Sequence, residues 1–185
     1  MSTKWKIVIA ALIIFLAAAT RLIDHPYNFT PIIAMSIFGG CYLHKRWGVL
    51  IPFAAMALSD VILYSNEYGW SMFNWKTTLA VYAGVGLAFF IGWQIKKRLT
   101  WYFTLGGALV ASLAFFFITN FSVWAFFDWY PHTLAGLTEC FTLALPFFRN
   151  SLAGDMVYTG LLFGVYEMAL YASSKKIASE TAVIS

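Results

Sequence analysis

Six apolar segments separated by polar connections fill most of the chain. About 20 apolar residues are needed to cross about 30 Å of hydrocarbon, so segments of this kind predict membrane-spanning helices. Only 11% of the residues are charged and 61% are hydrophobic, which excludes an ordinary soluble domain. The segments are 6–20, 31–43, 47–65, 77–94, 101–127 and 150–173. We therefore predict an all-α membrane protein, a bundle of six transmembrane helices that forms a single domain over residues 1–185 and contacts the lipid bilayer.

Lysine and arginine are concentrated in alternate connections. Nine of the twelve lie at the two ends of the chain or in the second and fourth connections: Lys4, Lys6, Lys45, Arg46, Lys96, Lys97, Arg98, Lys175 and Lys176. Cytoplasmic loops carry the excess of these residues, so we expect both termini in the cytoplasm and a multi-pass protein of the inner (cytoplasmic) membrane. The same bias is why we interpret 6–20 as the first span and not as a cleavable signal peptide.

Residues 133–148 are apolar enough to resemble a seventh span. A crossing there would place Lys175 and Lys176 on the outer side, against the charge bias. The segment also contains Glu139 and is shorter than a span should be. We expect an extra interfacial or re-entrant helix that covers the outer mouth of the bundle and ends at Pro146, before the last span begins.

The three outer connections concentrate polar and aromatic side chains at the membrane surface. The first reads RLIDHPYNFTP and the third reads SNEYGWSMFNWK, which is unusually polar for so apolar a chain. Two acids, Asp60 and Asp155, lie within spans, where a charge costs at least about 2.5 kcal/mol. Each acid needs a partner, a proton or water. A structural salt bridge with Arg21 or Arg149 and a role in a functional site both remain open for them.

Small residues spaced four apart predict close contacts between helices. Gly160 and Gly164 have this spacing in the last span, as do Gly107 and Ala111 in the fifth. Such pairs let helix backbones approach each other within a membrane.

Four motifs in chain order carry a family resemblance: FTPIIAMSIFGG, PFAAMALSD, TNFSVW and LPFFRNSLAGDMVYTGLLFG. With them, nearly the whole chain resembles the substrate-binding S-components of energy-coupling-factor vitamin transporters. It also looks like a small bacterial membrane family of that architecture without assigned function. The resemblance implies that a vitamin-like small molecule binds near the outer surface, under the connections 21–31, 65–76 and 128–149. It further implies uptake powered by a separate energising transporter module.

The candidate ligand-binding residues lie in or beside these outer connections. Arg21 and His25 are candidates because of the polar first connection, and the resemblance implies most of the others. The full set is Arg21, His25, Asn28, Trp70, Asn74, Asn120, Trp124, Arg149, Asn150 and Asp155.

One position departs from the resemblance. Many S-components that share an energising module carry alanines four apart in the first span, but here Ala10 is followed at that spacing by Ile14. A solitary transporter of this fold with a cobalamin-like ligand is therefore an alternative. His132 and Cys140 are the candidates for metal ligation, although two ligands eight residues apart are too few for a site, so we expect no metal and no other cofactor.

Other classes of function have little support in the sequence. There is no glycine-rich nucleotide-binding loop, and no basic run suggests a nucleic-acid partner. We do not expect an enzyme. Two alternatives to the transport subunit stay open. One is a structural or assembly subunit without a ligand, and the other is an intramembrane enzyme that uses Asp60, Asp155 and His132 as acid and base groups.

Overall fold

The computed structural model describes residues 3–184, apart from the side chains of Lys45 and of residues 176–184. Six α-helices account for most of these residues, and none of the described residues forms a strand. The helices are α1 (Thr3–Ala19), α2 (Ile32–Tyr42), α3 (Lys45–Leu63), α4 (Trp75–Ile95), α5 (Trp101–Phe126) and α6 (Leu134–Ile184). A 3₁₀ turn at Thr20–Leu22 follows α1, and a π-helical turn at Tyr64–Tyr68 extends α3. The prediction of an all-α fold is confirmed.

Four helical stretches are long and apolar enough to cross a membrane. They are Thr3–Leu22, Arg46–Tyr68, Trp75–Arg98 and Trp101–Phe126. The shortest has 20 residues, which at about 1.5 Å per residue covers about 30 Å of hydrocarbon. The chain is therefore a membrane protein, as the sequence predicts. By contrast, α2 has only 11 residues, and the apolar part of α6 is interrupted by Arg149, Asp155 and Glu167.

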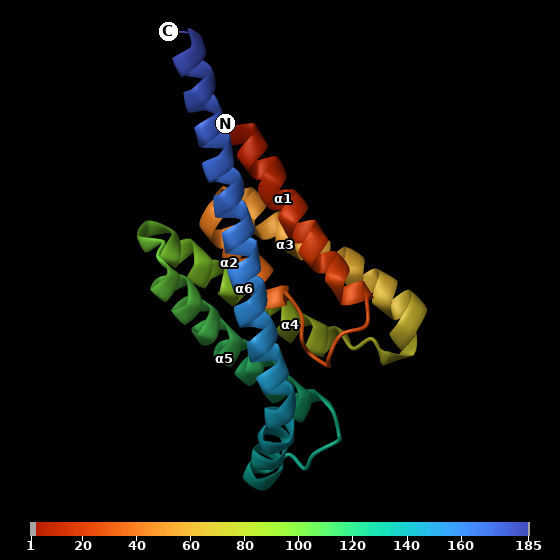
Figure 1. Cartoon of the computed structure of the whole chain (residues 1–185). Helices are drawn as coiled ribbons and strands as arrows, with labels where there is room; N and C mark the ends of the chain where they lie inside the picture. Colours follow the sequence, from red (N-terminus) through yellow and green to blue (C-terminus); the bar gives the residue numbers. More distant parts are fainter. Residues whose placement is uncertain (1–2, 185) are drawn as a thin grey trace.

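The connections between the helices divide into two groups in space. Figure 1 shows the start of α1 and the end of α6 in the upper half of the molecule, together with the α2–α3 and α4–α5 connections. The other three connections lie in the lower half. The lysine-rich and arginine-rich segments thus share one end of the bundle, which is the grouping that the charge pattern predicts.

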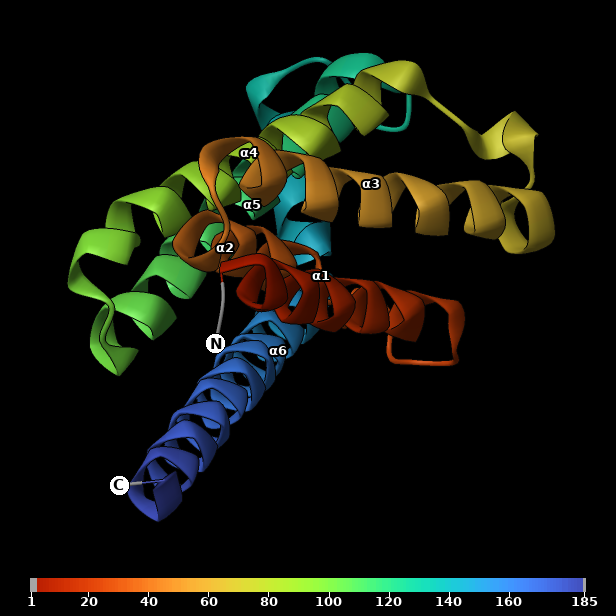
Figure 2. The same ribbon diagram turned by 90° about the horizontal axis from the view of Figure 1, so that it is seen from above.

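The short helix α2 is the centre of the bundle and contacts all five other helices (Figure 2). Two adjacent glycines let α3 and α4 approach it. A β-carbon added to Gly39 would lie 2.7 Å from the carbonyl oxygen of Gly48 on α3, and one added to Gly40 would overlap the backbone of Phe89 on α4. From the other side, a β-carbon on Gly92 would overlap the carbonyl oxygen of Ile37. Glycine is therefore required where these backbones cross.

The glycine pair of the last span does not pack within the bundle. A β-carbon added to Gly160 or Gly164 would meet no atom within 4 Å. The prediction that this pair brings two helices of the chain together is therefore wrong, although Gly107 does pack, against Ile95. Small residues spaced four apart show that one face of a helix lacks large side chains. They do not show which neighbouring helix, if any, packs against that face.

The segment before the last span is also different from the prediction. Instead of a separate interfacial helix that ends at Pro146, the structure has one continuous helix, α6, with Pro146 in its interior. Proline removes one backbone hydrogen bond, which usually bends or breaks a helix. Here aromatic rings on both sides of Pro146 pack against the same residue of α5. The ring centroid of Phe116 lies 5.6 Å from that of Phe141 and 4.7 Å from that of Phe148, so α5 contacts α6 on both sides of the proline.

Candidate ligand-binding site

A cavity of about 750 Å³ opens between the first connection, the end of α3, the start of α4, the end of α5 and residues 144–151 of α6. Its volume lies within the range of about 300–1,000 Å³ that is usual for small-molecule pockets. Polar side chains line much of it: Arg21, Asp24, His25, Asn28, Thr30, Asp60, Glu67, Thr77, Thr78, Thr119, Asn120 and Ser151. Aromatic rings supply most of the remaining wall: Tyr27, Tyr64, Tyr68, Tyr82, Phe115, Phe116, Phe147 and Phe148.

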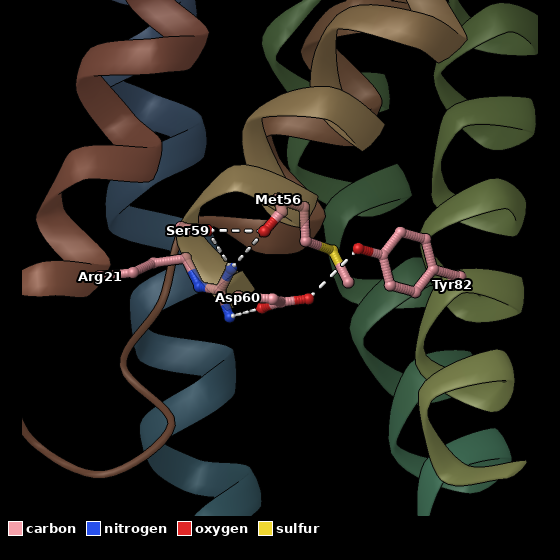
Figure 3. A network of polar contacts seen from close by, with 5 residues as sticks. All are labelled: Arg21, Met56, Ser59, Asp60 and Tyr82. Carbon is pink, nitrogen blue, oxygen red and sulfur yellow. Dashed lines mark hydrogen bonds and ion pairs between the residues drawn. The ribbon is translucent and has the colours of Figure 1, made fainter. Parts of the chain in front are cut away.

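An ion pair forms one wall of this cavity (Figure 3). The Nη2 atom of Arg21 lies 2.7 Å from Oδ1 of Asp60, and the two side chains are 10% and 21% exposed. The hydroxyl of Tyr82 on α4 donates to the second carboxylate oxygen over 3.2 Å. Nη1 of Arg21 donates to the hydroxyl of Ser59 and, over 3.4 Å, to the carbonyl of Met56. The pair therefore joins the 3₁₀ turn after α1 to α3 and α4, and each charge neutralises the other where both side chains are largely shielded from solvent.

Residues around Arg21 fix its position through contacts with α6. The hydroxyl of Thr20 donates to the carbonyl of Ala17 over 2.7 Å and accepts from the hydroxyl of Tyr158 over 2.9 Å. Further along the first connection, the ring of Phe29 packs 5.7 Å from that of Tyr158. Asn28 has a positive φ of 62°, which asparagine tolerates better than most residues. The connection is thus attached to α6 while Asp24, His25 and Asn28 remain at the cavity.

Four of the predicted ligand-binding residues line the cavity together: Arg21, His25, Asn28 and Asn120. The first three come from one connection, and Asn120 comes from the end of α5. The amide nitrogen of Asn120 donates to the carbonyl of Phe116 over 2.8 Å, which leaves its amide oxygen as an acceptor. Asn120 is about a hundred positions from the other three in the sequence, and the fold places all four around one cavity.

Three further candidates, Trp70, Asn74 and Trp124, have structural contacts outside the cavity lining. Asn74 caps the start of α4, since its side-chain oxygen accepts from the backbone nitrogens of Lys76 and Thr77 at 3.0 and 3.4 Å. Trp70 stacks on Tyr64 with the ring centroids 5.7 Å apart. The indole nitrogen of Trp124 donates to the carbonyl of Pro131 over 3.0 Å. Each supports a neighbour that shapes the site or its loops.

Arg149 and Asn150 are on α6 beside the cavity residues Phe148 and Ser151 but do not line the cavity themselves. Arg149 is exposed. Asp155 is also outside the lining, one turn further along the helix, and is 4% exposed. This part of α6 therefore contributes to the cavity through Ala144, Phe147, Phe148 and Ser151 instead of through its charged residues.

Asp155 connects three helices inside the bundle. The hydroxyl of Ser112 on α5 donates to its carboxylate over 2.5 Å. The backbone N–H of Ile33, in the first turn of α2, is the second group that faces the carboxylate. A carboxylate is stabilising at a helix N-terminus because the first N–H groups have no partner within the helix. Asp155 therefore fixes the central helix, and its partner is not one of the arginines.

We expect Asp155→Ala to lower the free energy of unfolding by about 2 kcal/mol, because Ser112 and the first turn of α2 would lose their acceptor. Thermal unfolding of the purified protein in detergent measures this loss. Asp128→Ala is the matched control, because Asp128 is exposed in the connection between α5 and α6. Equal melting temperatures for the two variants would contradict the assignment.

The residues named for the metal and enzyme alternatives lie in separate environments. Cys140 is buried, with its sulfur 3.5 Å from the carbonyl oxygen of Asn120, whereas His132 is exposed and packs against Trp124. The described part of the chain has no group of three or more His, Cys, Asp or Glu side chains that could hold a metal ion. Asp60 lines the cavity, while Asp155 and His132 do not.

Several lining residues were not among the predicted ones, most clearly Tyr64, Tyr68 and Tyr82. A signal for them exists in the sequence. Asp60, Tyr64 and Tyr68 are spaced four apart, as are Thr78 and Tyr82, so each set lies on one face of its helix. A polar face at the end of a helix therefore indicated these lining residues, which the composition of the adjoining connection did not.

A family model matches residues 1–179, and the chain belongs to that family, which is described as a family of unknown function (DUF6580). No curated protein and no solved structure matches the chain.

Proposed function

We propose that this member of DUF6580 is a substrate-binding membrane subunit of a small-molecule uptake transporter. The observation that carries the proposal is the cavity of about 750 Å³. It combines hydrogen-bonding side chains with aromatic walls, which is the usual chemistry of a pocket for a small organic molecule. It also lies at the end of the bundle that is poor in lysine and arginine.

The membrane orientation follows from that charge distribution. The end of the bundle with the two termini and the basic connections faces the cytoplasm, since basic residues are retained there. The cavity then opens toward the outer side of the inner membrane. In this arrangement α2 and α6 complete six crossings: α2 reaches the outer surface through the extended first connection, and the long α6 crosses with its middle part.

The resemblance to S-components of energy-coupling-factor transporters agrees with this arrangement. In the proposed mechanism, the ligand enters from outside, is covered by the outer connections and passes inward when the bundle moves. A separate energising module supplies the work. The segment 64–74 is suited to movement over the ligand, because it carries two lining tyrosines and a glycine, Gly69, with a φ of 74°.

We expect the purified protein to be stabilised by at least one member of a panel of vitamins and related small molecules, because a ligand that binds the folded state raises the melting temperature. A tryptophan in place of Thr119 would fill the cavity from α5 and remove the shift. Thr138→Trp is the control, since both hydroxyls bond to a carbonyl four residues earlier and Thr138 is exposed outside the cavity.

Two results would count against the proposal. No shift across the panel, with no small molecule in the purified protein, favours a structural or assembly subunit. An equal shift in wild type and Thr119→Trp places binding outside the cavity.

A further inference from the structure

The charges that line the cavity are unequal. Three carboxylates contribute to the wall, from Asp24, Asp60 and Glu67, whereas Arg21 is the only lysine or arginine among the described lining residues. The excess is two negative charges when His25 is neutral and one when it is protonated. Cavity walls of low dielectric constant focus such a field on whatever enters.

Arg21 does not offer its charge to a ligand. Asp60 neutralises it at 2.7 Å, and both terminal nitrogens donate to α3. The remaining nitrogen, Nε, is fully buried without a partner, so a ligand in the cavity does not reach it. An anionic ligand would therefore find no free lysine or arginine side chain among the described lining residues.

Asp24 and Glu67, by contrast, are uncompensated. Both are exposed at the cavity, and the one ion pair among the described side chains is that of Arg21 and Asp60. They come from different elements, the first connection and the π-helical turn after α3. Two separate elements therefore present a free carboxylate to the same space.

The aromatic part of the wall favours the same kind of ligand. Tyr64 and Tyr68 flank Glu67 in the sequence, the hydroxyl of Tyr82 donates to Asp60 over 3.2 Å, and all three tyrosines line the cavity. Tyr64 and Tyr68 pack edge to face with their centroids 5.9 Å apart. The face of an aromatic ring is electronegative and attracts organic cations, above all substituted ammonium groups. Carboxylates and ring faces together discriminate against anions.

We propose that the cavity binds an organic cation, an amine or a quaternary or heteroaromatic ammonium compound. This inference rests on the proposed function, because it assigns a chemical class to the ligand of the same cavity. In it, Asp24 and Glu67 neutralise the positive charge while the tyrosine rings cover the ligand's apolar surface.

The test compares three probes of similar size: benzyltrimethylammonium, its neutral carbon analogue neopentylbenzene, and the anion phenylacetate. Binding to the full-length protein in detergent is measured by titration calorimetry. We expect the cation to bind at least about tenfold more tightly than either other probe, and Asp24→Asn with Glu67→Gln to remove that preference. Added salt should weaken the binding of the cation and leave the binding of the neutral probe unchanged.

Asp128→Asn with Glu139→Gln is the matched control, because both acids are exposed in or beside the last outer connection and do not line the cavity. This double variant should keep the preference. Tighter binding of the neutral or anionic probe, or a preference that survives Asp24→Asn with Glu67→Gln, would overturn the cation assignment while leaving the proposed function in place. Failure of all three probes and of the vitamin panel would instead remove the proposed function.

Discussion

Gly92→Ala is expected to destabilise the protein by about 3 kcal/mol, because the added methyl group overpacks the crossing of α2 and α4. The new β-carbon would overlap the carbonyl oxygen of Ile37 and lie 2.8 Å from its Cα. These are backbone atoms of the central helix, so no side-chain rotation relieves the contact, and α2 and α4 must separate. The melting temperature in detergent and the fraction of monodisperse protein after size-exclusion chromatography measure the loss.

Gly164→Ala provides the control for this experiment. An added β-carbon at Gly164 meets nothing within 4 Å, and alanine is favoured over glycine inside a helix by roughly 0.5–1 kcal/mol. This variant should therefore be as stable as wild type or slightly more stable. If Gly92→Ala behaved like Gly164→Ala, the close crossing of α2 and α4 would be wrong.

Asp60→Ala is expected to cost about 2–3 kcal/mol in unfolding free energy, since it leaves the guanidinium of Arg21 without its counter-ion at a position only 10% exposed. Breaking a buried ion pair by removing one partner commonly costs 3–5 kcal/mol, and the partial exposure of Asp60 lowers the figure. Tyr82 would lose its acceptor as well. The melting temperature measured over a range of denaturant concentrations gives the change.

The double variant Arg21→Met with Asp60→Asn separates charge from packing. It removes both charges, keeps an acceptor for Tyr82 and replaces the stem of Arg21 with an apolar chain of similar length. We expect it to be more stable than Asp60→Ala, because no uncompensated charge remains. A double variant that is less stable than Asp60→Ala would show that the ion pair is not the source of the loss.

Features that depend on local composition were predictable from the sequence. The alternation of basic and polar connections predicted that the first, third and fifth connections share one end of the bundle. The short second segment likewise became a helix of 11 residues. Both follow from residue type and segment length, which act over a few turns of helix. The same holds for the cavity residues of the first connection, Arg21, His25 and Asn28, whose polarity is evident without a partner.

Features that depend on residues distant in the sequence were not predictable from it. In the sequence, Pro146 indicates the end of a helix. In the structure the helix continues, and Phe116, thirty positions earlier, packs against rings on both sides of Pro146. From the sequence alone, Asp60 and Asp155 could each form a salt bridge with Arg21 or with Arg149. The fold pairs Asp60 with Arg21 and gives Asp155 to Ser112. Asn74 was a candidate for ligand binding, although an asparagine directly before a helix is also the standard signal of an N-cap.

The cavity between the first connection and the ends of α3 and α5 is proposed to hold a small molecule. Native mass spectrometry of the protein in lipid nanodiscs, after exposure to the compound that stabilises it most, tests this claim directly. We predict one bound molecule on wild type and on Thr138→Trp, and none on Thr119→Trp. Equal occupancy of Thr119→Trp and wild type, or an empty wild-type protein, would contradict it.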